Sequence, residues 1–301
     1  MNENNLKNTE KTNINWFPGH MAKTRRLISD NLKLVDVVVE LVDARIPLAS
    51  RNPEIDKIVG SKPRILVMNK ADISDAGANA KWISYFSSKG ICTIAADSLS
   101  GKGINKFGAA IDSVLKEKFE KDKKRGIVKQ TVKMMIVGIP NVGKSSLINR
   151  LSGKAAAKTG NRPGVTMTKQ WIKLAGKYEL LDTPGILWPK FEDADTAKKI
   201  AFTGGIKDEI MDVEELACFL IKYLRKNYFS SLCERYKIKE SEEELSGLTD
   251  FEFLELIGKK RGALVSGGEI DTFKAAGFLL DDFRAAKLGR ISLEVPGGER
   301  L

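Results

Sequence analysis

Four short apolar runs, rich in β-branched residues, are spaced through the first half of the chain. Runs of this kind are typical of strands buried on both faces of a parallel sheet. The predicted strands are residues 36–42 (DVVVELV), 64–68 (RILVM), 90–96 (GICTIAA) and 133–137 (KMMIV). Apolar residues at helical spacing between them, at 80–89 and 104–118, predict helices that alternate with the strands. The pattern predicts an α/β domain in which helices flank a mostly parallel sheet.

The pattern changes after residue 153. Residues 154–168 are rich in small and turn-forming residues and have no period, which predicts a loop. A tight AGK turn then separates two predicted strands, residues 170–174 and 178–181. Further along, apolar residues recur at helical spacing, which predicts a small all-α domain from residues 216–224, 245–264 and 270–289.

The chain therefore divides into five predicted parts. These are an N-terminal segment, the α/β domain, a connector, the helical C-terminal domain and a tail, at residues 1–30, 31–190, 191–205, 206–290 and 291–301. The N-terminal segment begins with polar residues and then carries an aromatic, turn-forming cluster, WFPGHM, at 16–21.

Composition excludes several classes of protein. No apolar run approaches the length of a membrane span, and the N-terminus has neither a signal-peptide core nor a transit pattern. The three cysteines are scattered, which argues against a disulfide framework or a zinc site and favours buried apolar roles. We therefore expect a cytoplasmic protein.

The formal net charge of +11 is unevenly distributed. Residues 1–199 hold 35 Lys and Arg against 20 Asp and Glu, whereas residues 200–301 hold 15 against 19. A basic excess suits a polyanion such as RNA, although a solvated charged surface that binds nothing has the same composition. The same two interpretations apply to residues 116–133, a predicted connector with eight basic and three acidic residues.

Residues 138–145 (GIPNVGKS) match a phosphate-binding loop between a strand and a helix. Gly138 and Gly143 let backbone N–H groups turn toward a phosphate, Lys144 reaches the terminal phosphates, and Ser145 offers a hydroxyl to magnesium. The alternative is a glycine-rich turn without a ligand. The predicted nucleotide contacts of this loop are Asn141, Val142, Gly143, Lys144, Ser145 and Ser146.

A guanine-reading motif, N-K-x-D, directly follows the strand at 64–68. Asp72 can accept hydrogen bonds from N1–H and the exocyclic amine of guanine, the stem of Lys70 can cover the base, and Asn69 can brace the loop. Ala71 completes the motif. Adenine has no N1 proton, so the pocket should select guanine.

A second base-contacting loop is predicted one helix and one strand later. There the backbone N–H groups of Asp97 and Ser98 lie where they can meet the guanine oxygen. A plain strand-to-helix turn is the alternative.

Elements that respond to the γ-phosphate are predicted after the phosphate loop. Thr166 is the best-placed hydroxyl of the loop at 154–168 to join magnesium, although Thr168, or no metal contact, is also compatible with the pattern. The strand at 178–181 runs into a D-x-x-G element. Asp182 can hold magnesium through water, and the N–H of Gly185 can meet the γ-phosphate.

These motifs describe a GTPase, but their order is rotated, because the base-reading motifs precede the phosphate motifs. The sequence resembles the ribosome biogenesis GTPase A family of circularly permuted, YlqF-like, TRAFAC-class GTPases. The resemblance covers residues 15–190 and rests on WFPGHMAKTRR, VDARIPLASRNP, NKAD, GIPNVGKSS, RPGVT and DTPGILWP. It implies a permuted P-loop GTPase domain with a helical C-terminal domain. It also implies a GTP-hydrolysing assembly factor that binds rRNA and proteins of the immature large ribosomal subunit.

Catalysis departs from the common GTPase pattern. The residue after D-x-x-G is Ile186, which cannot orient a water molecule, so intrinsic hydrolysis should be slow. The resemblance implies catalytic roles for His20, Lys144 and Gly185, with His20 orienting water once the subunit activates turnover. From the residues alone, a structural role is favoured for His20, because a lone histidine beside aromatic residues is usually structural. The resemblance further implies magnesium and, through Asn141, potassium as an activating ion.

The rotated order has a mechanical consequence. The chain after Gly185 need not return to the sheet, so it can lead directly to the helical domain and bias its docking. We expect a monomer that acts in this way on subunit precursors. The competing hypothesis is a nucleotide-dependent switch that recruits a protein partner without touching RNA.

Overall fold

A computed structural model describes residues 26, 28–127, 131–153, 171–181, 194–206 and 211–298. The α/β part contains, in chain order, β1 (Val37–Asp43), α2 (Ile55–Val59), β2 (Arg64–Asn69), α3 (Ala76–Ser88), β3 (Cys92–Ala95), the 3₁₀ helix η1 (Ile104–Lys106), α4 (Phe107–Val114), α5 (Lys116–Lys124), β4 (Val132–Val137), α6 (Lys144–Ser152), β5 (Trp171–Lys173) and β6 (Tyr178–Leu181). The helical part contains α7 (Ala194–Phe202), α8 (Val213–Asn227), α9 (Phe229–Tyr236), α10 (Glu242–Leu245), α11 (Asp250–Arg261) and α12 (Thr272–Arg284).

The six described strands form one sheet in the order β3-β2-β1-β4-β6-β5. All neighbouring pairs are parallel except β5 with β6. The mostly parallel sheet predicted from the apolar runs is confirmed. Because β1 lies between β2 and β4, the strand ends that carry the two nucleotide motifs flank the end of β1, although the motifs are about 70 residues apart in sequence.

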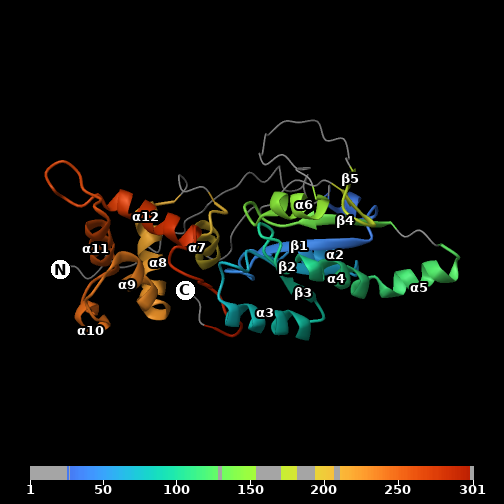
Figure 1. The fold of residues 1–301 in the computed structure, drawn as a ribbon, viewed down its shortest axis with the longest axis horizontal. Coiled ribbons are helices and arrows are strands. Elements are labelled where there is room, and N and C mark those ends of the chain that lie inside the picture. Colours follow the sequence, from blue (N-terminus) through green and yellow to red (C-terminus); the bar gives the residue numbers. More distant parts are fainter. Residues whose placement is uncertain are drawn as a thin grey trace, which may run out of the picture.

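Every residue of β1 is buried, because helices cover both faces of the sheet. Val37, Val39 and Leu41 pack with α4 and α6, whereas Val38 and Val42 pack with apolar residues on the opposite face. The first of these clusters continues without a break through α7 into the helical domain. Figure 1 shows the helical domain at one end of the sheet, with α7 between them.

The helical domain is built around α8, which packs against α11 and α12. Its helix ends are chemically defined. Asp212 and Asp271 accept backbone N–H groups at the starts of α8 and α12, and Thr249 forms a capping box with Glu252 at the start of α11. Among the described residues, no helix is both long and apolar enough to cross a bilayer.

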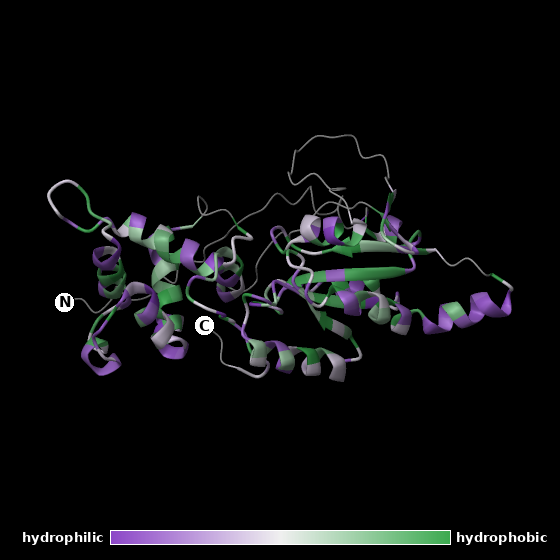
Figure 2. Ribbon diagram, viewed as in Figure 1, coloured by the Kyte–Doolittle hydropathy of each residue, from purple (hydrophilic) through white to green (hydrophobic). Residues whose placement is uncertain are grey.

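Several sequence predictions differ from the structure. The predicted helix at 104–118 is interrupted at the buried Leu115, and the predicted connector at 116–133 begins with α5. α5 buries no side chain, so its apolar pattern was too weak to reveal it, and it projects from the end of the sheet opposite the helical domain (Figure 1). Figure 2 shows that it is mostly hydrophilic. The cysteines, predicted as buried, are half-buried.

The predicted connector and tail also have defined structure. α7 occupies most of the connector, because its apolar residues pack into the core. Ile291, Ser292 and Leu293, at the start of the predicted tail, are buried. Their burial depends on contacts with residues more than 200 positions away, which no local pattern reveals.

Candidate nucleotide-binding site

The phosphate-binding loop connects β4 to α6, and its two glycines are required by close approach. A Cβ at Gly138 would lie 2.5 Å from the carbonyl oxygen of Leu41, in the second half of β1. Gly143 has φ +96°, and a Cβ there would lie 2.3 Å from Nδ2 of Asn69. No larger residue fits at either position without moving a neighbour. The predicted need for glycine therefore has a steric cause in each case.

Lys144 is the first residue of α6, and its side chain reaches back across the loop. Its Nζ donates to the carbonyl oxygens of Gly138 at 2.8 Å and Ile139 at 2.7 Å. Burial lowers the pKa of Lys144 to about 8. A partly desolvated cation beside a helix N-terminus is suited to phosphate oxygens, which can replace the carbonyls as partners.

Asn69, the last residue of β2, joins the guanine-reading motif to the phosphate loop. Its Nδ2 donates to the carbonyl oxygen of Val142 at 2.7 Å. Its Oδ1 accepts hydrogen bonds from the backbone N–H of Ser98 at 3.0 Å and the hydroxyl of Ser98 at 2.7 Å. Three loops from distant parts of the sequence thus meet at one buried side chain.

Lys70 is held by an acid that sequence reasoning did not identify. Its Nζ lies 3.0 Å from Oδ2 of Asp43, which ends β1, and Asp43 also pairs with Arg45 at 2.8 Å. Burial raises the pKa of Asp43, but Arg45 and Lys70 outweigh it and hold that pKa well below its ordinary value. This ion pair fixes the end of the Lys70 side chain, whose stem is the part predicted to cover the base. The available signal was a carboxylate at the end of a buried strand, within VDARIP.

Asp72 is exposed, one residue beyond the half-buried Ala71. The predicted second base loop is more tightly built than a simple turn. The N–H of Asp97 donates to the carbonyl of Lys102, and that of Ser98 donates to Asn69. The carboxylate of Asp97 accepts the N–H groups of Leu99 and Ser100. The two N–H groups predicted to face guanine are thus already donors within the protein.

The base loop is also joined to α6. Nε of Arg150, on this helix, donates to the carbonyl oxygen of Ser98 at 3.3 Å. Hydrogen bonds from Ser100 and the N–H of Leu99 keep the pKa of Asp97 below its ordinary value although burial raises it. Asp97 therefore holds the loop as a carboxylate at neutral pH.

Asn141, at the tip of the phosphate loop, reaches the helical part of the chain. It has φ +61°, and its Nδ2 donates to the carbonyl oxygen of Gly204, just after α7. The amide nitrogen thus links the loop to α7. The contact adds a tertiary role to the ion-binding role that the resemblance implies.

Oxygen ligands for magnesium are partly defined. Ser145 and Ser146 are half-buried in the first turn of α6, and a hydroxyl oxygen is a hard donor that suits magnesium. Four predicted residues, His20, Thr166, Asp182 and Gly185, lie outside the described residues, as does Thr168.

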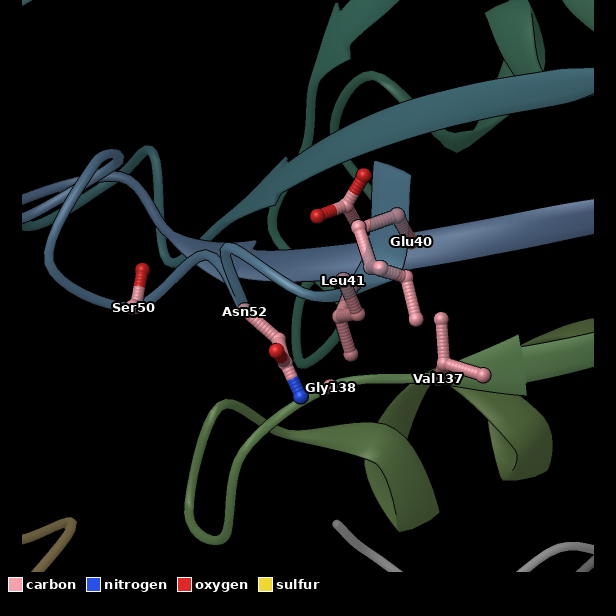
Figure 3. A pocket seen from close by; sticks show the side chains of 7 residues that line it. Glu40, Leu41, Ser50, Asn52, Val137 and Gly138 are labelled. Carbon is pink, nitrogen blue, oxygen red and sulfur yellow. The ribbon is translucent and has the colours of Figure 1, made fainter. Parts of the chain in front are cut away.

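A small cavity lies beside the first glycine of the phosphate loop. It is lined by Glu40, Leu41, Ser50, Asn52, Ile55, Val137 and Gly138, and Figure 3 shows the side chain of Glu40 extending from β1 on one side of it. Burial raises the pKa of Glu40, an effect that Arg51 and Arg64 oppose. The space suits about one water molecule and is too small for a nucleotide.

Comparisons with known proteins give independent information about the family of the chain. A family model described as 50S ribosome-binding GTPase matches residues 133–252, a range that starts at β4 and omits the guanine-reading motif. Ribosome biogenesis GTPase A from Bacillus licheniformis is 49% identical and aligns over 94% of this chain and 98% of that protein. The protein of the same name from Bacillus cereus is also 49% identical, over 94% of each chain.

The fold has a similar counterpart among solved structures. The crystal structure of GNP-bound YlqF from T. maritima has a TM-score of 0.60 and 28% sequence identity, and the match covers 93% of this chain and 100% of that chain. Sequence and structure thus agree over nearly the whole chain, including the rotated order of motifs. The chain belongs to the ribosome biogenesis GTPase A family of circularly permuted, YlqF-like GTPases.

Proposed function

We propose that this protein hydrolyses GTP to GDP and phosphate while bound to the immature large ribosomal subunit, in the cytoplasm, and thereby assists the maturation of that subunit. The observation that best supports GTP binding is the hydrogen bond from Asn69 to Val142, which joins a guanine-reading motif to a phosphate loop. The ribosomal part is supported by the relatives named ribosome biogenesis GTPase A.

Each side of the pocket has a defined task in this proposal. Asp72 and the stem of Lys70 select guanine, and the loop of Asp97 and Ser98 closes over the edge of the base. Lys144 and the N–H groups of residues 141–146 bind the phosphates, and Ser145 contributes a hydroxyl to magnesium. Thr166, Asp182 and Gly185 complete the γ-phosphate side, with Gly185 sensing hydrolysis.

Turnover is slow in the free protein, because Ile186 cannot orient the attacking water. The subunit accelerates it by placing His20 against that water. Potassium supplies an additional positive charge at the phosphates through the side-chain oxygen of Asn141. The amide nitrogen of Asn141 donates to the carbonyl oxygen of Gly204, just after α7. This contact supports the proposed role, because it involves the nitrogen and not the side-chain oxygen that would bind potassium.

The nucleotide state biases the position of the helical domain. Support comes from α7, which lies between the sheet and the helical domain, contributes Ile200 and Phe202 to the shared core, and is followed by the carbonyl that binds Asn141. Hydrogen exchange of residues 194–220 should therefore differ between GDP and a nonhydrolysable GTP analogue when the subunit is bound. Equal exchange in the two states would rule out this coupling.

Contact with rRNA is supported by α5, whose last turn presents Lys121, Lys123 and Lys124 to solvent, beyond the end of the sheet opposite the helical domain. The second candidate function, recruitment of a protein partner without RNA contact, is favoured by exposed apolar side chains on the helical domain. Leu264 and Phe273 are 51% and 65% exposed. Steep salt dependence of binding to subunit precursors supports RNA contact, whereas tight, salt-independent binding to an isolated protein supports the alternative.

The test of the proposal is GTP hydrolysis with and without purified large subunits. We expect activation of about 10³-fold or more, as in strongly partner-activated GTPases. His20→Ala should remove most of the activation while leaving GTP affinity unchanged. An unstimulated rate with bound subunits would contradict the proposal, and full stimulation of the variant would remove His20 from the mechanism.

A further inference from the structure

The five residues after Gly289 form a segment that we call the C-terminal strap, residues 290–294. In Figure 1 it is the red segment that follows α12, passes α7 and approaches α3. Its middle residues, Ile291, Ser292 and Leu293, are each no more than 2% exposed. Such burial means that the strap is part of the folded core.

One side of the strap holds the guanine-reading loop. Arg290 donates through Nη2 to the carbonyl oxygen of Ala71 at 2.9 Å and through Nε to that of Ser74 at 2.8 Å. The backbone N–H of Ile291 donates to the carbonyl of Ile73 at 3.3 Å. A single guanidinium group therefore bridges the two residues that flank Asp72 and Ile73, and so fixes the backbone from which Asp72 projects.

Two further contacts extend this support. The hydroxyl of Ser292 accepts the N–H of Asp75, the N-cap of α3, at 3.1 Å. The N–H of Leu293 donates to the carbonyl of Arg45, the residue whose side chain pairs with Asp43. Because Asp43 also holds Lys70, the strap supports the guanine-reading loop from both of its ends.

The last residue of the strap fixes its far end. The backbone carbonyl of Glu294 accepts Nε1 of Trp82 on α3, and its carboxylate accepts the N–H groups of Leu48 and Ala49. Lys199 of α7 lies 3.4 Å from the same carboxylate. The buried charge is therefore compensated by a cation and two backbone donors.

The other side of the strap is held by the helical domain. The hydroxyls of Tyr223 on α8 and Tyr228 at the start of α9 donate to the carbonyl oxygen of Ser292 at 2.8 and 3.2 Å. The N–H of Ser292 donates back to the hydroxyl of Tyr228 at 3.2 Å. The strap is thus a short physical link between the helical domain and the residues that read the base.

We propose that the C-terminal strap positions the guanine-reading loop, with Arg290 as the main positioning residue, so that the helical domain sets the dissociation rate of guanine nucleotides. The inference rests on the guanine-binding part of the proposed function. The guanine-reading loop needs such support, because Lys70 has φ +61° and Asp72 is exposed, so local packing alone leaves the carboxylate weakly oriented. A partner that displaces the helical domain would loosen the strap and accelerate nucleotide release.

The first test is Arg290→Ala in the full chain, with dissociation of fluorescent GDP measured by stopped flow. Loss of two charge-assisted hydrogen bonds should raise the dissociation rate about tenfold or more, with a small change in the association rate. Arg290→Lys, which cannot bridge two carbonyls in a fork, should be intermediate. Hydrogen exchange at residues 71–75 should be slowest in the wild type, faster in Arg290→Lys and fastest in Arg290→Ala.

Arg235→Ala is the matched control, because Arg235 pairs with Asp282 within the helical domain. It should leave GDP dissociation at the wild-type rate. Equal acceleration by Arg235→Ala and Arg290→Ala would overturn the proposal in favour of general loosening. Wild-type dissociation and exchange in both Arg290 variants would overturn it outright.

The second test uses a residue that does not touch the guanine-reading loop. Tyr228→Phe removes the hydroxyl that pairs with Ser292, and should accelerate GDP release severalfold. Tyr236→Phe is its control, since that hydroxyl bonds Asp282 on α12. Identical release from the two variants would contradict transmission through the strap. If wild-type protein bound ADP as well as GDP, the proposed function would fail before either test applied.

Discussion

The hydrogen bond between Asn69 and Val142 should make nucleotide binding depend on one buried amide. Asn69→Ala removes three hydrogen bonds, one to the phosphate loop and two to Ser98. At a net contribution of about 1 kcal/mol each, their loss should lower the free energy of unfolding by about 3 kcal/mol. The phosphate loop and the base loops would then no longer be held in register.

Asn69→Asp separates the loss of the hydrogen bond to the phosphate loop from the loss of the two hydrogen bonds to Ser98. The near-isosteric aspartate keeps an acceptor for Ser98 but places an oxygen opposite the carbonyl of Val142, which lies 2.7 Å from the wild-type donor. This repulsion should lower the free energy of unfolding by about 1–3 kcal/mol, and the destabilised contact lies at the junction between the loops. If about 1.4 kcal/mol of this appears in binding, GDP affinity falls about tenfold.

The assay is isothermal titration of GDP at a temperature where thermal unfolding shows that both variants are folded. Asn31→Ala is the control, because Asn31 is a buried amide in the helical residues before β1. It should change stability and leave GDP affinity unaltered. Folded Asn69 variants that bind GDP with wild-type affinity would refute the reasoning that the two motifs form one pocket.

Three further outcomes follow from the site. Gly143→Ala should abolish GDP binding, because its Cβ would lie 2.3 Å from Nδ2 of Asn69; calorimetry that detects wild-type affinity would contradict this steric argument. GDP affinity should fall as pH rises above 8, by up to about tenfold per pH unit. The free protein loses the Lys144 proton near pH 8, whereas bound phosphates raise its pKa and retain the proton. Titrations in buffers of different ionisation enthalpy should accordingly detect proton uptake at pH 8.5 and little at pH 7, and equal uptake at both would exclude Lys144 as its source. Asp43→Asn should lower the free energy of unfolding at pH 7 by about 3–5 kcal/mol, since it leaves the buried Arg45 uncompensated; a denaturant midpoint equal to that of the wild type would show that the ion pair contributes nothing.

Much of the sheet could be predicted, because its strands are buried on both faces and therefore read as continuous apolar runs. β1 and β2 were each located to within one residue at their ends. The two nucleotide motifs were found for a related reason. Each follows the carboxyl end of a parallel strand, and the chemistry of base and phosphate restricts the residue types at fixed spacing.

Other features depend on contacts that sequence spacing does not encode. The role of Asp43 appears only when β1 and β2 lie side by side and bring Lys70 to its carboxylate. The strap sequence RISLE alternates polar and apolar residues over only five positions, a pattern that does not indicate burial of the polar Ser292, and its burial requires both the guanine-reading loop and the tyrosines of the helical domain. The pattern does not predict the second half of α5 for the opposite reason, because a helix with no fully buried side chain has only a weak apolar stripe.

The central claim, that a single pocket reads guanine at Asp72 and binds phosphate at Lys144, is tested most directly by the base preference of Asp72→Asn. Xanthine carries a carbonyl where guanine carries its exocyclic amine, so the amide of asparagine can donate to xanthine but cannot accept both guanine donors. We expect this variant to bind xanthosine diphosphate more tightly than GDP, and Lys144→Ala to weaken the binding of both nucleotides. A variant that still prefers GDP over xanthosine diphosphate would contradict the central claim.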